Sequence, residues 1–253
     1  MTFTQRWVGC AALVGLVAGS GAYAQVSSIN SASVQTRVFN DVPGSTVAVI
    51  NKYPTGISIT DVGVSQATGF ANRHVWDFSN DGGTSAYKLN NNDYFQASFD
   101  LTLTGNPITP RKEAGFLLST TSSGDIQFIV NTDGHEVVQF GGIGFYSFNA
   151  SNGITYNDGD TITLGISYFL DGNGKNALMF TANGVNSPVQ EFATGGIGDG
   201  STLGGYFQIV NDPTNPLNSG TASFAKISIV PEPSTLALLG LGALPLLLRR
   251  RRG

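Results

Sequence analysis

The 253 residues carry 17 acidic and 13 basic side chains, which gives a net charge of −4 at pH 7, and only 12% of the residues are charged. This balance argues against DNA or RNA as a partner, because phosphate recognition needs a clustered excess of Lys and Arg. Cys10 is the single cysteine, so an intrachain disulfide cannot form and packing alone must hold the fold.

The first 24 residues have the pattern of a secretory signal peptide. Arg6 precedes an apolar stretch from Trp7 to Ala18, and small residues then lead to the small-x-small sequence whose outer positions are Ala22 and Ala24. We predict a signal helix over residues 1–24, export through the Sec translocon and cleavage by signal peptidase after Ala24.

Residues 25–230 are predicted to form one domain. Removing the segments on either side takes away Arg6 and four C-terminal arginines against Glu232, so the net charge of the domain is −8. Such a domain is long enough for a sizeable core, and its charge favours solubility over attraction to anionic surfaces.

Alternating apolar residues run through this domain. The four clearest runs are Phe95–Leu103, Ile126–Val130, Ile162–Tyr168 and Ala225–Ile229. Alternation over this length predicts half-buried strands, and we expect Ala225, Ile227 and Ile229 to share one face. Clusters of Asn, Asp and Gly separate the runs, and those at 132–135 and 171–175 predict hairpin turns. Helical periodicity is confined to the two ends of the chain, so we expect an antiparallel sandwich or barrel.

The order of these runs from Asp93 to Val230 resembles the concanavalin A-like jelly roll of lectins, glucanases and laminin-G domains. A Gly-Phe-Leu-Leu strand at Gly115–Leu118 leads into a polar turn, a late strand pair is joined by a loop, and a long strand closes the domain. The resemblance implies an all-β, antiparallel, two-sheet jelly-roll sandwich. Residues 25–92 fit less clearly and are expected to supply edge strands.

Glycan-cleaving chemistry requires two carboxylates that face one sugar bond. The glutamates of the domain are Glu113, Glu136 and Glu191. None stands in the Glu-x-Asp-x-x-Glu pattern of the glucanases on this fold. Two closer pairs, Asp133 with Glu136 and Asp158 with Asp160, fall in turns, where solvated charge is the simpler account.

Nucleophilic catalysis and zinc binding are also disfavoured. The two histidines, His74 and His135, each have an aspartate nearby, at Asp77 and Asp133. A Gly-x-Ser-x-Gly stretch is absent from the sequence, and two scattered histidines without a cysteine do not make a zinc site. We therefore predict that the protein is not an enzyme.

Two oxygen-rich turns are candidate calcium sites. Asp171 and Asn173 stand in the first turn, and Asn211 and Asp212 stand in the second. Carboxylate and amide oxygens are the ligands that Ca²⁺ prefers, although neither turn has the later Glu of an EF-hand. Ordinary turns are the simpler account of both, and calcium remains the only cofactor that the sequence indicates.

Three aromatic residues are candidate glycan contacts: Trp76, Tyr146 and Tyr206. Trp76 alternates with His74 and Phe78, so a core position is the better interpretation for it. Tyr146 and Tyr206 stand in Gly-flanked segments and are expected to be exposed.

The C-terminus has the pattern of a short membrane anchor. Residues from Leu236 to Leu248 are all Leu, Ala, Gly or Pro, and the cluster Arg249, Arg250, Arg251 and Arg252 follows. An apolar helix without a polar face predicts insertion into the inner membrane, and flanking arginines can snorkel to offset its shortness. The arginines are expected to stay in the cytoplasm, which places the domain on the far side.

The residues Pro231, Glu232 and Pro233, followed by this apolar segment and the arginine cluster, resemble the PEP-CTERM sorting signal. We assign residues 231–253 to it. The resemblance implies a Gram-negative bacterium that makes exopolysaccharide, and a membrane-embedded exosortase that cuts near the motif and releases the protein to the cell surface or medium. The two prolines keep the motif extended and outside the helix.

These features predict an exported surface or matrix protein that binds or scaffolds exopolysaccharide without catalysis. One alternative is a structural or adhesive matrix protein without glycan affinity. The other is a glycoside hydrolase or lyase of the same fold.

Overall fold

The computed structural model describes residues 26–232. The predicted signal peptide, with Ala22 and Ala24, and the predicted membrane helix with Arg249 to Arg252 lie outside these residues. Within residues 26–232, every helix is too short or too polar to cross a membrane.

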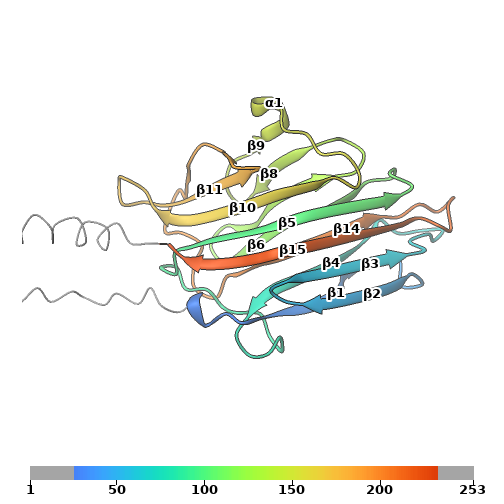
Figure 1. Cartoon of the computed structure of the whole chain (residues 1–253), viewed down its shortest axis with the longest axis horizontal. Helices are drawn as coiled ribbons and strands as arrows, with labels where there is room; N and C mark the ends of the chain where they lie inside the picture. Colours follow the sequence, from blue (N-terminus) through green and yellow to red (C-terminus); the bar gives the residue numbers. More distant parts are fainter. Residues whose placement is uncertain (1–25, 233–253) are drawn as a thin grey trace, which may run out of the picture.

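Two antiparallel sheets pack face to face (Figure 1). Sheet A has the order β1 (Ser31–Asn40), β4 (Ala71–Ser79), β14 (Thr202–Val210), β6 (Lys112–Thr120), β7 (Gly124–Asn131), β8 (Val137–Gly141) and β9 (Tyr146–Ser147). Sheet B has the order β12 (Val185–Asn186), β11 (Asn176–Ala182), β10 (Thr161–Leu170), β5 (Phe95–Asn106), β15 (Ser219–Pro231), β3 (Gly56–Val62) and β2 (Thr46–Lys52), and β13 (Gln190–Glu191) also pairs with β11. The predicted two-sheet jelly-roll sandwich is confirmed.

The predicted hairpins form where the turn residues indicated. Strands β7 and β8 pair across the turn at 132–135, and β10 pairs with β11 across the turn at 171–175. The single α-helix of the described residues, α1 (Phe148–Asn152), was not predicted, since one turn is too short for helical periodicity. Its N-cap Ser147 accepts a hydrogen bond from the amide of Ala150, and Gly153 ends it in the left-handed conformation.

The N-terminal third contributes more than edge strands. Strands β1 and β2 are edges of sheets A and B, as expected, but β3 and β4 lie inside them. The late strands β14 and β15 do not pair, because one belongs to each sheet. The closing strand β15 instead lies between β5 and β3 in the middle of sheet B.

A bulge in β15 changes which of its residues face the core. Its register against β5 shifts between Ala225 and Ser228, and Lys226 has a positive φ of 51°. Phe224 and Ile227 are buried, whereas Ala225 is half-buried on the opposite face. The expectation that Ala225 shares a face with Ile227 is therefore wrong, because an extra residue in the strand reverses the alternation.

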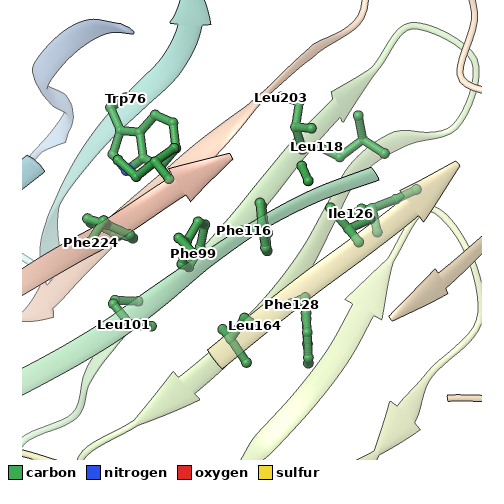
Figure 2. Close-up of a cluster of buried hydrophobic side chains, with 14 of the residues drawn as sticks. Trp76, Phe99, Leu101, Phe116, Leu118, Ile126, Phe128, Leu164, Leu203 and Phe224 are labelled. Atoms are coloured by element: carbon green, nitrogen blue, oxygen red, sulfur yellow. The ribbon is translucent and has the colours of Figure 1, made fainter. Parts of the chain in front are cut away.

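Aromatic side chains dominate the core between the sheets (Figure 2). Trp76 is fully buried, and its ring centroid lies 5.3 Å from that of Phe78 and 5.5 Å from that of Phe224. Edge-to-face pairs of this kind stabilise a core beyond the area they bury. Trp76 is therefore not a glycan contact: its alternation with His74 and Phe78 places all three between the sheets.

The described chain begins and ends at the same end of the sandwich. The 3₁₀ helix η1 (Val26–Ser28) contacts β15, and the tip of β15 lies beside it (Figure 1). The opposite end carries the loops at 63–70, 107–111 and 211–218. The first and last described residues therefore lie at one end of the sandwich and not on the outer face of either sheet.

The outer face of sheet A is unusually well covered. Side chains that point away from the core, among them Ile129 and Tyr206, are 1% and 0% exposed. Glycines at Gly115 and Gly204 allow strands to approach closely, since a Cβ would lie 2.0 Å from the carbonyl oxygen of Phe128 and 1.8 Å from that of Trp76. Glycine kinks of this kind curve a sheet, and the burial indicates that sheet A curves around its outer face.

Candidate functional site

A row of polar side chains crosses the outer face of sheet A. In register, Arg73 of β4 stands opposite Gln208 of β14, Gln208 opposite Glu113 of β6, and Glu113 opposite Asn131 of β7. We call these four residues the polar row. Side chains opposite one another on neighbouring strands point to the same face, so the pleat alone brings the four together from distant parts of the sequence.

Hydrogen bonds join the members of the row. The Nε of Arg73 donates to Oε1 of Gln208 over 2.9 Å, and Nε2 of Gln208 donates to Oε1 of Glu113 over 3.1 Å. Gln208 and Glu113 are each 8% exposed, whereas Arg73 is half-buried. Among the described residues, Nε is the only guanidinium atom of Arg73 with a recorded hydrogen bond, so its terminal nitrogens can serve a ligand.

Tyr206 lies beneath the row. The guanidinium carbon of Arg73 is 5.4 Å from the centre of its ring, within cation–π range. Burial, followed by the nearby Glu113 carboxylate, raises the pKa of Tyr206 well above its ordinary value. The ring is fully buried, so the expectation that Tyr206 offers an exposed stacking face is wrong. The ring of Tyr206 lies under Arg73 instead. It is buried because sheet A curves around its outer face, whereas a flat sheet would leave the ring exposed.

Burial also affects the carboxyl groups of this face. It raises the pKa of Glu113, against the lowering effects of the nearby Tyr206, Arg111 and Arg73 side chains. Burial likewise raises the pKa of Asp77 on β4 to about 6, against the effects of Thr202 and Lys88. The face thus holds two carboxyl groups whose charged forms are penalised.

The row continues through Asn131 into a charged cluster. The amide of Asn131 donates to the carboxylate of Glu136, and Arg111 bridges two carboxylates, with Nε 3.2 Å from Oδ1 of Asp133 and a terminal nitrogen 3.2 Å from Oε2 of Glu136. Asp133 and Glu136 were expected to be solvated turn charges, and both are instead ion-paired. All three side chains keep partial exposure at the edge of the site.

Two exposed phenylalanines flank the other end of the row. Phe39 of β1 stands opposite Arg73, so it points to the same outer face, and 42% of it is exposed. Phe70, which directly precedes β4, is 60% exposed, and the two ring centroids lie 6.5 Å apart at 69°. Exposed aromatic pairs beside convergent polar groups are typical of ligand-binding surfaces.

Sequence reasoning missed the polar row and the two phenylalanines. Arg73 and Gln208 each alternate with buried residues, so their outward direction could be read from the sequence. Their adjacency could not, because it depends on the pairing of β4 with β14, which lie more than a hundred residues apart.

Tyr146, the remaining predicted aromatic contact, lies in β9 at the far edge of sheet A. It is half-buried, its hydroxyl donates to Asn152 over 2.8 Å, and its ring packs edge-to-face on Phe148. Strand β8 therefore separates Tyr146 from Asn131 of β7, the nearest member of the polar row.

The two predicted calcium turns lie at opposite ends of the sandwich. The turn with Asp171 and Asn173 lies near the start of β5, whereas Asn211 and Asp212 lie near the start of β15, whose 13 residues span about 40 Å. Oδ1 of Asp171 accepts the amides of Asn173 and Lys175, and Oδ1 of Asp212 accepts the amide of Thr214. The structure does not combine the four residues into one site, and across residues 26–232 no group of three His, Cys, Asp or Glu is placed to hold a metal.

The other candidate catalytic groups do not assemble either. His74 faces the core and Asp77 the outer face of the same strand, while Nδ1 of His135 is 3.1 Å from the carbonyl oxygen of Tyr156. Asp158 accepts the amide of Gly105, and Glu191 pairs with Lys175. These contacts are those of turns and strand ends.

Comparison with known proteins identifies the C-terminal segment. Residues 230–252 match the PEP-CTERM protein-sorting motif. The chain thus carries the signal of an exported protein that an exosortase recognises and that a C-terminal segment anchors transiently. No curated protein matches the chain in sequence.

Solved structures with a similar fold include two alginate lyases and an endo-glucanase. An alginate lyase from Corynebacterium sp. has a TM-score of 0.51 and 13% identity, over 79% of this chain and 93% of that one. The alginate lyase A1-II′, a member of polysaccharide lyase family 7, has a TM-score of 0.52 and 12% identity, over 81% and 97%. A family 16 endo-glucanase from Bacteroides ovatus has a TM-score of 0.50 and 9% identity, over 79% and 94%. At these identities the likeness shows the jelly-roll fold.

Proposed function

We propose that this protein is exported and processed at its C-terminus, and that it binds exopolysaccharide on the outer face of sheet A without cleaving it. The observation that carries the proposal is the polar row, with exposed Phe39 and Phe70 at one end and Arg111 at the other. A sugar chain presents apolar C–H faces and many hydroxyls. Aromatic rings suit the first, and planar amide, guanidinium and carboxylate groups suit the second.

The position of this face fits an anchored protein. The polar row crosses the outer face of sheet A, whereas the described chain begins and ends at one end of the sandwich (Figure 1). A polysaccharide could therefore reach the row both before and after the C-terminal segment is removed. The fold is also that of alginate lyases and of a glucanase, so surfaces of this architecture can accommodate sugar chains.

The proposal of binding without catalysis rests on how the carboxylates are held. Glu113 is 8% exposed and accepts a hydrogen bond from Gln208, while Glu136 is tied to Asn131 and Arg111. An acid and a base that act on a glycosidic bond must both reach the sugar. In this protein, hydrogen bonds and an ion pair with neighbouring side chains already occupy the carboxylates of Glu113 and Glu136.

One observation favours a glycan-cleaving enzyme as a second candidate. Burial raises the pKa of Glu113, which favours its protonated form, and Glu136 is ion-paired with Arg111. A carboxyl group with a raised pKa near a second carboxyl group is an arrangement that acid–base catalysis uses. Asn131 is the residue between them along the row.

The test is a binding assay on residues 26–232, which contain both sheets and the core between them. The panel comprises alginate, mixed-linkage glucan and exopolysaccharide from a producing strain, each with and without a calcium chelator. We expect binding to at least one polysaccharide, and we expect the double variant Phe39→Ala with Arg73→Ala to weaken it about tenfold or more. The matched control is Phe145→Ala, because Phe145 is 68% exposed and lies near the edge of sheet A opposite Phe39, about 30 Å from it.

Each alternative predicts a different result. Wild-type protein that binds no polysaccharide would favour a structural matrix protein. Binding that the Phe145→Ala control and the double variant weaken equally would remove the site from sheet A. Shortening of the polysaccharide that Glu113→Gln or Glu136→Gln abolishes would establish the enzyme instead.

A further inference from the structure

The last strand of the folded domain contains the beginning of the sorting motif. Val230 pairs with Gln96 and Pro231 with Phe95, so β15 includes the first proline of the Pro231-Glu232-Pro233 motif. The predicted boundary between domain and signal was Val230, and the strand runs one residue beyond it.

Glu232 is held as well, although it follows the strand. Its amide donates to the carbonyl oxygen of Tyr94 over 3.1 Å, which continues the pairing with the segment that leads into β5. Its side chain accepts a hydrogen bond at Oε1 from Nε2 of Gln96 over 3.1 Å. Both main chain and side chain therefore fix Glu232 at the end of sheet B.

This arrangement matters for proteolysis because proteases bind their substrates as extended, unpaired chain. Backbone groups already bonded within a sheet must first be released, and cleavage then follows the population of the opened form. The pairing of β15 with β3 covers Ser219 to Ala225, and the amides of Lys226 and Ile227 donate to the carbonyl oxygens of Thr55 and Pro54. Beyond Ile227, the described part of β15 pairs with β5 alone. The strand end is thus held on one side, and Gln96 contributes the side-chain contact that fixes Glu232.

We propose that the folded domain sets the N-terminal limit of processing, so that the sorting enzyme cleaves on the C-terminal side of Glu232. The mature protein then keeps Pro231, the last residue of β15, and Glu232, which follows it. In this step one peptide bond breaks, the new amine leaves with the C-terminal segment, and the carbonyl carbon passes to water or to another acceptor nucleophile. Gln96 is a positioning residue for Glu232 and takes no part in the chemistry.

The proposal is independent of the glycan site, because it concerns the end of sheet B near the described chain ends and not the outer face of sheet A. The first experiment is mass spectrometry of the mature protein from a strain that processes the full chain. We expect every mature C-terminus to include Glu232. A product that ends at Pro231, or earlier in β15, would overturn the proposal.

A second experiment tests whether pairing of the strand end imposes the limit. The Gln96→Ala variant of the full chain should raise the rate of hydrogen exchange in the peptide that covers residues 226–232 about threefold to tenfold, because the opened form gains population. The control is Gln35→Ala, since Gln35 is exposed on the edge strand β1 of the other sheet. Exchange that is equally fast in the wild type and in Gln96→Ala would show that the strand end is not held, and would overturn the proposal.

A third variant separates the motif from the sheet. A Gly-Ser-Gly-Ser insertion between Val230 and Pro231 leaves β15 paired through Val230 but moves the motif away. We expect faster processing of this variant at an unchanged melting temperature, because the enzyme no longer competes with β5. Processing that is unchanged or slower in the correctly folded variant would contradict a limit set by the fold.

Discussion

His74 and Asp61 form a buried pair between the two sheets. Nε2 of His74 lies 3.1 Å from Oδ2 of Asp61, and both side chains are fully buried. Nδ1 of His74 accepts the amide of Arg37, and Asn72 also donates to Oδ2 of Asp61. Because Nδ1 accepts a hydrogen bond, the ring proton is on Nε2, which donates a hydrogen bond to the carboxylate of Asp61. The pair joins β3 of sheet B to β4 of sheet A.

The environment of Asp61 gives a stability prediction. Burial alone would raise its pKa, but hydrogen bonds from His74, Ser45 and Asn72 bring the pKa below its ordinary value. The variant His74→Phe keeps a ring against Phe207 and removes both ring nitrogens. Because one donor to a buried carboxylate is lost, we expect the free energy of unfolding to fall by about 3 kcal/mol at pH 7.

The pH dependence of this deficit follows from the direction of the shift. A carboxyl group with a lowered pKa adds stability above the pKa of the unfolded chain, about 3.9, and this stability is lost as the pH falls. Denaturant unfolding at pH 7 and pH 3 should therefore show a smaller difference at pH 3. As a control, the variant His74→Phe with Asp61→Asn should be less destabilised than the two single changes added together. Strict additivity would show that the two residues do not interact.

Asp77 predicts the opposite pH behaviour. Burial raises its pKa to about 6, so the folded protein is penalised once the group ionises. A carboxyl group with a raised pKa contributes its full stability below about pH 3.9, and this stability is lost as the pH rises to about 6. The variant Asp77→Asn should therefore be more stable than the wild type at pH 7.5 by about 1–3 kcal/mol and should melt at a higher temperature. The difference should be smaller at pH 4.

The control for Asp77 is Asp125→Asn on β7 of the same sheet. Asp125 is exposed, so its removal should leave the melting temperature nearly unchanged at both pH values. Destabilisation by Asp77→Asn at pH 7.5 would mean that its partners stabilise the charge more than burial penalises it.

The sequence predicted the fold well because period-two alternation is local. The strands around Phe99, Phe128 and Ile166 needed only their own residues to be recognised, and the Asp-Gly and Asn-Gly turns placed the hairpins. The prediction failed at Ala225, where a bulge adds one residue that no local pattern announces. It also failed for His74, which was considered with Asp77 on its own strand, whereas its partner Asp61 lies across the sandwich.

The candidate site was harder to predict for a physical reason. Trp76 and Tyr206 are aromatic residues that suggest sugar binding, yet the core holds one and the curvature of sheet A covers the other. The exposed ring is that of Phe39, whose position opposite Arg73 depends on the pairing of β1 with β4 beyond a bulge. Long-range register decides such a site, and a single sequence does not specify it.

Asn211, one of the predicted calcium ligands, ties two loops together. Its Oδ1 accepts the amide of Gln66, and its Nδ2 donates to the carbonyl oxygen of Gln66, both over 3.0 Å. We expect Asn211→Ala to lower stability by about 1–2 kcal/mol, equally with calcium and with a chelator, in thermal unfolding. The control is Asn173→Ala in the exposed turn at the other end, which should change little. A loss that appears only when calcium is present would support the metal-ligand interpretation.

Gly205 sits where the backbone of β14 touches the indole of Trp76. A Cβ at this position would lie 2.5 Å from Nε1 of Trp76 and 2.8 Å from a ring carbon of Phe224. Both side chains are packed in the aromatic core (Figure 2), so neither can move without disturbing its neighbours. We expect Gly205→Ala to destabilise the domain by about 1–3 kcal/mol or more in denaturant unfolding, because an overpacked core must shift rotamers or backbone.

The matched control is Gly172→Ala, where a Cβ meets no atom within 4 Å and φ lies outside the left-handed region. There the smaller entropy of the unfolded chain should leave stability unchanged or slightly raised. Equal effects of the two changes would mean that Trp76 has room to move, and that the core around it is less tightly packed than the contacts of Gly205 imply.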